Sequence, residues 1–143
     1  MKLVAATPDD CALLAQMNKQ LINDEGSDNP MNVAELTVRM QGFLRGSYCA
    51  WFVVDDMEQV IGYALVDMAS IPYYVRHFFI AVPFRRRGMG RMAFALLRGQ
   101  LDYQPLELDV LMSNPTGLAF WQALGLHPRS MRLRTIVSHN TLK

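Results

Sequence analysis

The stretch "FFIAVPFRRRGMGRMAFALL", residues 78 to 97, passes from apolar residues through three arginines and a Gly-Met-Gly into a helical pattern. Its first five residues have strand character, and apolar residues recur at i, i+3, i+4, i+7 and i+8 from Met89, which indicates one helical face. The junction carries glycines that let backbone N–H groups approach a ligand closely. The stretch therefore predicts a strand, a turn and a helix.

This junction is a candidate anion site. The free N–H groups and the positive dipole end of a helix starting near Gly90 attract a phosphate, and Arg85, Arg86 and Arg87 add positive charge. A short basic run can also be a solvated turn or a weak nucleic-acid patch, but the glycines favour the phosphate. Because the formal net charge is only +1, a strongly basic nucleic-acid binder is excluded, and we expect no nucleic-acid partner.

Outward from this junction, apolar and turn patterns predict alternating strands and helices. Strands are expected over residues 2–6, 49–54, 59–66, 74–82, 106–111 and 132–137. Helices are expected from Thr7 to about Ile22, from about Val33 to Gly46, after Gly90, and from Asn114–Pro115 to Gly125. The pattern indicates one domain over residues 1–143, an α/β (α+β) fold with a mixed sheet covered by helices in three layers.

Composition narrows the class of protein further. The chain is 51% hydrophobic and 19% charged, as expected of a globular protein. No apolar stretch approaches the eighteen or so residues of a membrane span, and the N-terminus does not resemble a signal peptide, so we expect a cytoplasmic protein without a membrane partner. Cys11 and Cys49 stand alone and His77, His127 and His139 are scattered, so we expect no metal site.

One interpretation of the glycine-rich junction is a dinucleotide site. Residues 88–93, Gly-Met-Gly-Arg-Met-Ala, fit G-x-G-x-x-G/A, and Glu107 and Asp109 lie near the expected distance downstream. In that motif, however, the glycines follow the strand almost immediately, whereas residues 83–87 intervene here. An antiparallel hairpin also precedes the unit and leaves no room for a series of parallel units, so this interpretation is disfavoured.

Arg85-x-x-Gly88-x-Gly90, following a strand and opening a helix, resembles the pyrophosphate loop of the GNAT superfamily of acyl-CoA-dependent N-acyltransferases. A second stretch, "NPTGLAFWQALGL" at residues 114–126, resembles the later motif of that family, and the order of elements matches over essentially the whole chain. The resemblance implies a mostly antiparallel central sheet with a parallel pair at the cofactor slot and helices on both faces.

The resemblance also implies which residues hold acetyl-CoA. The loop would bind the pyrophosphate through backbone amides, the preceding strand would pair with the pantetheine arm through its backbone, and the asparagine of the second motif would reach that arm or cap its helix. The implied cofactor-binding residues are Phe78, Phe79, Ile80, Arg85, Arg86, Arg87, Gly88, Met89, Gly90, Arg91 and Asn114.

The catalytic residues are less clear, because Trp121 occupies the position at which the family usually has a tyrosine that protonates the departing thiolate. An indole N–H cannot serve as that acid. A thiol with a pKa of about 8.5 leaves as thiolate at pH 7 at a cost of about 2 kcal/mol, so the base should matter more. We expect Asp109, on the outward face of a central strand 106–111, to be that base. His77 and Tyr74 are alternatives, and Asp109 could instead be a solvated or ion-paired residue.

Together these features predict an N-acetyltransferase that moves an acetyl group from acetyl-CoA to a primary amine of a small molecule or protein, by direct attack in a ternary complex. The alternative is a non-catalytic acyl-CoA-binding or regulatory module. The residue that suggests it is Trp121, because it replaces the usual tyrosine. Acidic residues 24, 25 and 28 favour a cationic acceptor, whereas Arg132 and Arg134 point to an acidic one. The last strand could pair with or swap into a second copy, forming a homodimer.

Overall fold

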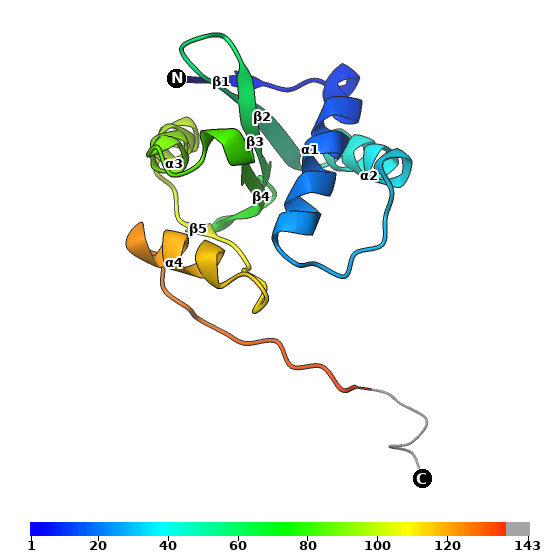
Figure 1. Cartoon of the computed structure of the whole chain (residues 1–143), viewed down its shortest axis with the longest axis vertical. Helices are drawn as coiled ribbons and strands as arrows, with labels where there is room; N and C mark the ends of the chain where they lie inside the picture. Colours follow the sequence, from blue (N-terminus) through cyan, green and yellow to red (C-terminus); the bar gives the residue numbers. More distant parts are fainter. Residues whose placement is uncertain (137–143) are drawn as a thin grey trace.

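A computed structural model describes residues 1 to 136 and shows one five-stranded sheet in the order β1-β2-β3-β4-β5 (Figure 1). The strands are β1 (Lys2–Ala5), β2 (Tyr48–Val54), β3 (Val60–Asp67), β4 (Tyr73–Ile80) and β5 (Leu106–Glu107). The pairs from β1 to β4 are antiparallel and β4 pairs with β5 in parallel. The predicted mixed sheet with one parallel pair is therefore confirmed.

Helices cover both faces of this sheet. They are α1 (Cys11–Asp24), α2 (Val33–Arg45), α3 (Met89–Gln100) and α4 (Pro115–Ala123), with short 3-10 turns at Pro8–Asp10 and Val82–Phe84. Since side chains alternate along a strand, Phe52 packs beneath α1 and α2, whereas its neighbour Trp51 packs with the α3 and α4 side. This gives the expected three layers (Figure 1).

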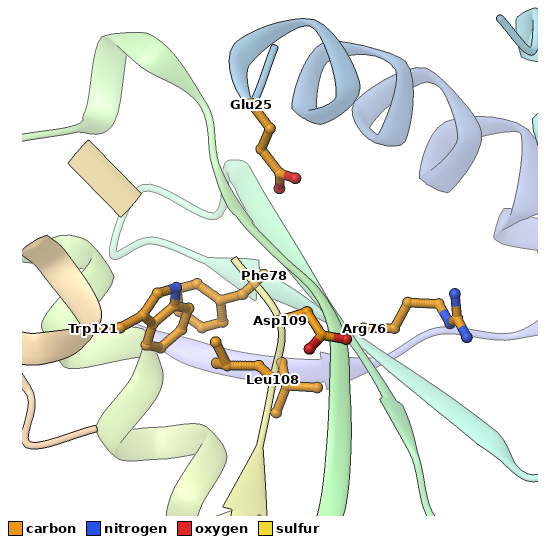
Figure 2. A pocket seen from close by; sticks show the side chains of 7 residues that line it. Glu25, Arg76, Phe78, Leu108, Asp109 and Trp121 are labelled. Atoms are coloured by element: carbon orange, nitrogen blue, oxygen red, sulfur yellow. The ribbon is translucent and has the colours of Figure 1, made fainter. Parts of the chain in front are cut away.

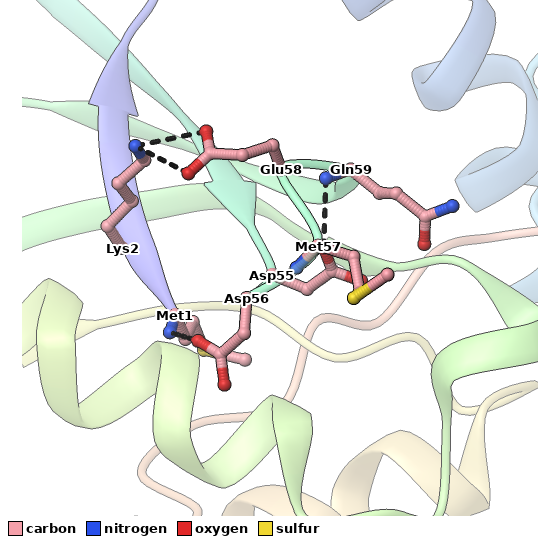
Figure 3. A network of polar contacts seen from close by, with 7 residues as sticks. All are labelled: Met1, Lys2, Asp55, Asp56, Met57, Glu58 and Gln59. Carbon is pink, nitrogen blue, oxygen red and sulfur yellow. Dashed lines mark hydrogen bonds and ion pairs between the residues drawn. The ribbon is translucent and has the colours of Figure 1, made fainter.

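The β2–β3 hairpin is closed by a turn whose side chains bond their own backbone (Figure 3). Asp55 Oδ1 accepts the N–H groups of Met57 and Gln59, both at 2.9 Å. The turn also contacts β1, where Lys2 Nζ lies 3.1 Å from Glu58 Oε2. These contacts are exposed and contribute little to stability, so the hairpin depends mainly on its buried apolar residues.

β4 contains a bulge that affects its pairing with β5. Leu65 of β3 faces His77, but the next residue, Val66, faces Val75, so Arg76 is an extra residue in β4. Such a bulge bends a strand and increases its twist. Beyond Tyr74, β4 accordingly diverges from β5.

Of two further predicted strands, one is much shorter than expected and the other is not formed within the described residues. The strand expected over residues 106–111 pairs only through Leu106–Glu107, because β4 diverges from it beyond these residues. It also lies at the edge of the sheet rather than in its centre. Residues 132–136 of the last expected strand form no strand and lead away from the body (Figure 1); Val137 lies outside the described residues.

Other boundaries shift by a few residues. The strand expected over residues 74–82 ends at Ile80, and a 3-10 turn follows in which Pro83 cannot donate a ladder hydrogen bond. None of the helices described here has the length and apolar character to cross a bilayer.

Candidate functional site

The divergence of β4 and β5 leaves an unpaired backbone edge in the middle of the molecule. The two strands share only the pairs Tyr73 with Leu106 and Tyr74 with Glu107. Beyond them, within residues 1–136, the side of β4 away from β3 pairs with no strand as far as Ile80. An extended ligand with amide groups can bind such an edge as an added strand.

The directions of the backbone groups decide which residues of β4 can serve such a ligand. Ala81 N–H donates to Ile61 of β3 at 2.8 Å, so by alternation the polar groups of Ile80 and Phe78 point to the free edge. The Phe79 carbonyl instead lies against β3: a Cβ at Gly62 would be 1.9 Å from its oxygen. Of the three predicted residues Phe78, Phe79 and Ile80, only the first and last present backbone groups at the edge.

The loop that follows β4 leads into α3 and presents backbone N–H groups. Gly88, the N-cap residue of α3, has φ +74°, and Arg86 has φ +61°; both lie in the left-handed region. Within the described part of the chain, the N–H groups of residues 86–91 donate to no protein acceptor. The first turn of a helix leaves such donors free, so the loop presents N–H groups to which an anion could bind; that it binds one stays a prediction.

The arginines of this loop divide into two kinds. Arg85 turns inward, donating from Nε to the Ile80 carbonyl at 2.6 Å and from Nη2 to Asp24 of α1. Its charge is therefore used to hold the loop against α1, and Asp24 is not free to bind an amine. Arg86, Arg87 and Arg91 are exposed, and their charges remain available to a phosphate.

A small cavity of about 30 Å³ lies where β4 and β5 separate (Figure 2). Its lining consists of Glu25, Val75, Arg76, Phe78, Leu108, Asp109 and Trp121. Figure 2 shows Glu25 reaching down from the end of α1 and the Arg76 guanidinium pointing away from the Trp121 side. The cavity thus places two carboxylates, from Glu25 and Asp109, beside an aromatic wall.

Asp109 is held by a hydrogen bond from β4. Tyr74 Oη donates to Asp109 Oδ2 at 2.8 Å. Burial, and then the bond and charge of Asp109, raise the pKa of Tyr74 to about 12, so Tyr74 stays protonated and keeps donating at neutral pH. Burial raises the pKa of Glu25 as well, and the neighbouring Asp24 charge adds to the effect.

Trp121 is part of an aromatic cluster rather than an isolated site residue. Its ring centroid lies 5.3 Å from that of Phe78, 5.0 Å from Phe94 and 4.8 Å from Phe120. Phe120 in turn contacts the start of α3, since a Cβ at Gly90 would lie 3.2 Å from its ring. The cluster therefore fastens α4 to β4 and α3, and the indole forms one wall of the cavity.

His77, an alternative base, lies outside the cavity. Its Nδ1 is 3.0 Å from the hydroxyl of the buried Tyr63. Burial lowers the pKa of His77 to about 3, and the positive charges of Arg39 and Arg76 act in the same direction. Because Asp109 lines the cavity and His77 does not, the geometry favours Asp109.

Asn114 caps α4, since its Oδ1 accepts the Gly117 N–H at 3.0 Å. The predicted contact between Asn114 and pantetheine stays a prediction. Three features could not be predicted from the sequence, because each depends on a partner distant in the chain: the extra residue Arg76 in β4, the contact of Phe120 with α3, and the close approach of Gly62 to β4. In the described part of the chain, no group of three His, Cys, Asp or Glu side chains could hold a metal ion.

No protein-family model and no curated protein matches the sequence. Solved structures do match. A mutant of the BH1408 protein of Bacillus halodurans has a TM-score of 0.76 at 21% identity, over 96% of this chain and all of that one. A predicted acetyltransferase of Clostridium acetobutylicum, solved with acetyl-CoA, has a TM-score of 0.74 at 17% identity, over 94% of this chain and 95% of its own.

The aminoglycoside N-acetyltransferase AAC(6')-Iy, solved in complex with CoA, has a TM-score of 0.69 at 14% identity, over 96% of this chain and 94% of that chain. All three likenesses extend over nearly the full length of both proteins. The diverging β4 and β5, the glycine loop at the start of α3 and these likenesses together show that the chain has the fold of the GNAT acetyltransferases.

Proposed function

We propose that this protein transfers an acetyl group from acetyl-CoA to a primary amine, by direct attack in a ternary complex. The observation that carries the proposal is the free edge of β4 leading directly to the unbonded N–H groups of residues 86–91. An edge followed by an anion site suits a ligand that has an amide-bearing arm joined to a pyrophosphate. Two proteins of the same fold were solved with acetyl-CoA or CoA, which supports the choice of ligand.

The residues present fit acetyl-CoA at each part. The N–H groups of residues 86–91 and the exposed Arg86, Arg87 and Arg91 would hold the pyrophosphate. Backbone groups of Phe78 and the N–H of Ile80 would pair with the pantetheine amides, whereas the Ile80 carbonyl already accepts from Arg85 Nε. Asn114 Nδ2 remains a donor for the same arm, because the cap uses only Oδ1.

The acceptor amine needs a base before it can attack. An alkylammonium with a pKa near 10.4 loses its proton at pH 7 at a cost of about 4.6 kcal/mol. Asp109 would accept that proton while Tyr74 holds its carboxylate in place. The amine nitrogen then forms a bond to the acetyl carbon, the carbon–sulfur bond breaks, and the sulfur leaves as thiolate, while the nitrogen gives its second proton to solvent. General catalysis of this kind contributes about 10²- to 10⁴-fold.

The charge of the cavity favours a cationic acceptor. Glu25 and Asp109 are its two acidic lining residues, and both can attract an ammonium group. Of the acidic loop residues considered from the sequence, Glu25 lines the cavity whereas Asp24 pairs with Arg85. A small molecule and an exposed protein amine both satisfy this chemistry.

A second candidate is a module that binds acyl-CoA without catalysis, and the observation that favours it is the packing of Trp121 among three other aromatic rings. Replacing Trp121 with Tyr separates the candidates. A large gain in the rate of CoA release would indicate an acid that this chain has lost. A lower rate would indicate that the indole shapes the cavity of an active enzyme, and no release by either form would favour the binding module.

The first experiment is a thermal-shift titration with acetyl-CoA, using NAD and ATP as controls. A ligand at one hundred times its dissociation constant adds about 2.7 kcal/mol to the free energy of unfolding, so a shift with acetyl-CoA alone is expected. A panel of amines would then be screened for CoA release. No shift with acetyl-CoA, or a larger one with NAD, would overturn the assignment of residues 86–91.

A further inference from the structure

Two arginines from different elements face the same aromatic ring between α2 and β4. The guanidinium carbon of Arg39, in α2, lies 5.5 Å from the centre of the Phe43 ring, and that of Arg76, in β4, lies 5.1 Å from the same centre. Like charges held this close repel each other, so the arrangement costs free energy. A nearby anionic group would offset this cost.

The part of the chain that the structure describes offers these two arginines no counter-ion. Within residues 1–136, neither of them forms an ion pair with a carboxylate. Arg76 Nε donates to the Tyr48 hydroxyl at 2.7 Å, and the buried Nε of Arg39 has no partner among these residues. Burial, and then the charge of Arg76, lower the pKa of Arg39, as expected of a guanidinium without a neighbouring anion. Both side chains therefore keep N–H donors for an anionic ligand.

The bulge in β4 brings Arg76 to this position. In a regular strand, neighbouring side chains alternate between the two faces of the sheet. Here Val75 packs with the α3 side, whereas the side chains of both Arg76 and His77 contact the Phe43 ring of α2. The extra residue thus directs two successive side chains toward α2. Because bulges next to active sites re-aim side chains in this way, the bulge suits a binding role for Arg76.

The same arginine borders the proposed acceptor site. Arg76 lines the cavity between β4 and β5 together with Glu25 and Asp109. Tyr74 joins the two kinds of charge, because its hydroxyl donates to Asp109 Oδ2 at 2.8 Å and its ring centre lies 5.5 Å from the Arg76 guanidinium. Figure 2 shows this guanidinium on the side away from Trp121. An acidic group at the hydroxyl and a basic group at the ring of one tyrosine are within reach of one small molecule.

We propose that the acceptor is a small amine that also carries an anionic group, a carboxylate or a phosphate. This inference rests on the proposed acetyl transfer, in which Glu25 and Asp109 attract the ammonium end. Arg76 binds the anionic end, and Arg39 adds a second positive charge. A guanidinium suits either acid, because its planar N–H donors match a pair of oxygen atoms. The anionic group takes no part in the reaction; it fixes the position of the amine.

Pairs of amines matched in length test the proposal. β-Alanine and propylamine differ only in the carboxylate, as do 5-aminovalerate and pentylamine, and phosphoethanolamine presents a phosphate instead. We expect kcat/KM for the best anionic amine to exceed that for its alkylamine at least about tenfold, as one charge-assisted pair allows. The better of the carboxylate and phosphate substrates identifies the acid. Equal values within every pair would overturn the proposal and leave the acetyl transfer standing.

Substitutions of the arginines test which side chains recognise the anion. The ratio of kcat/KM for the anionic amine to that for its alkylamine should fall about tenfold in Arg76→Gln and by a smaller factor in Arg39→Gln. Arg76→Lys keeps the charge and should recover part of the ratio. Arg45→Gln is the matched control, since Arg45 is exposed in the last turn of α2, and it should keep the wild-type ratio. A ratio that neither Arg76→Gln nor Arg39→Gln lowers would overturn the proposal; circular dichroism checks that the variants are folded.

Binding without turnover separates this proposal from the proposed function. Calorimetry with the same amines, on the protein with and without saturating CoA, measures their affinity in the absence of a reaction. If an anionic amine binds at least about tenfold more tightly than its alkylamine but acetyl-CoA releases no CoA, then the recognition of the anion stands and the acetyl transfer fails. If neither amine of any pair binds, or both bind equally, the recognition of the anion fails whatever the activity.

Discussion

The chain up to Leu101 and the chain after it contain similar apolar patterns but reach very different burial. Within residues 1–136, every buried residue lies between Cys11 and Leu101, and none lies beyond. The first region covers its strands with its own helices, whereas the second has a two-residue strand, an unburied α4 and an extended segment. The difference shows that an apolar pattern in the sequence specifies which face of a helix or strand is apolar. Whether that face is buried depends on which other parts of the molecule, or which other molecules, pack against it. In the second region, part of what meets it is the ligand proposed above.

The largest expected effect is on turnover, through Asp109 in the second region. Asp109→Asn should lower kcat by about 10²- to 10⁴-fold, because an amide cannot take the proton of the acceptor although it can still accept from Tyr74. Affinity for acetyl-CoA, measured by calorimetry, should not change. Glu107→Gln is the control, since Glu107 lies on the same exposed face but does not line the cavity. Turnover that Asp109→Asn leaves unaltered at every pH would remove Asp109 as the base.

Stability should depend on the first region more than on the second. Leu65 is fully buried and Leu118 is 38% exposed. Leu65→Ala should therefore lower the free energy of unfolding by about 3 kcal/mol, and Leu118→Ala by less than about 1 kcal/mol. Urea denaturation measures both. Equal losses would contradict the division between the two regions.

The affinity of the glycine loop at residues 86–91 for acetyl-CoA should depend on the charge of the loop. This loop belongs to the first region and is contacted by Phe120 of the second. Gly88→Asp puts a carboxylate next to the proposed pyrophosphate, and a hundredfold loss of acetyl-CoA affinity, about 2.7 kcal/mol, is expected. Gly88→Asn is the matched control, because asparagine and aspartate have the same shape and both tolerate a positive φ. A Cβ at this position meets nothing within 4 Å. Calorimetry should find only a small loss for Gly88→Asn. Equal affinities for the two variants would remove the phosphate from this position.

The smallest effect is a dependence of stability on pH that originates in the first region. Because burial lowers the pKa of His77 from 6.5 to about 3, the unfolded chain binds a proton in this interval that the folded chain does not. Stability therefore falls as the pH drops below 6.5, and at pH 5 the contribution is about 2 kcal/mol. Thermal melts of the wild type and His77→Gln should differ in this slope. Parallel pH profiles would show that folding does not lower the pKa of His77.

The sequence predicts the first region well because its elements are local and paired with neighbours in the chain. The hairpin strands expected over residues 49–54 and 59–66 differ from β2 and β3 by one residue at three ends of the four. The glycine loop was also located, since Gly88 and Gly90 act through backbone geometry that a short motif encodes.

The misses have one physical origin: each depends on contacts between distant parts of the chain. The pattern LELDVL indicates a strand, but nothing in it reveals that β4 bulges at Arg76 and diverges after two pairs. Arg85 is equally suited to a phosphate and to Asp24, which lies 61 positions earlier. The direction of the Phe79 carbonyl likewise follows from pairing with β3.

Gly62 and Gly42 look alike in the sequence, but their mutational tolerance should be opposite. An alanine Cβ at Gly42, within α2, meets nothing within 4 Å, whereas at Gly62 it would lie 1.9 Å from the Phe79 carbonyl oxygen. Any side chain at Gly62 must push β4 outward, toward its free edge. The width of the proposed ligand slot on one side of β4 thus depends on a glycine of β3 on the other side.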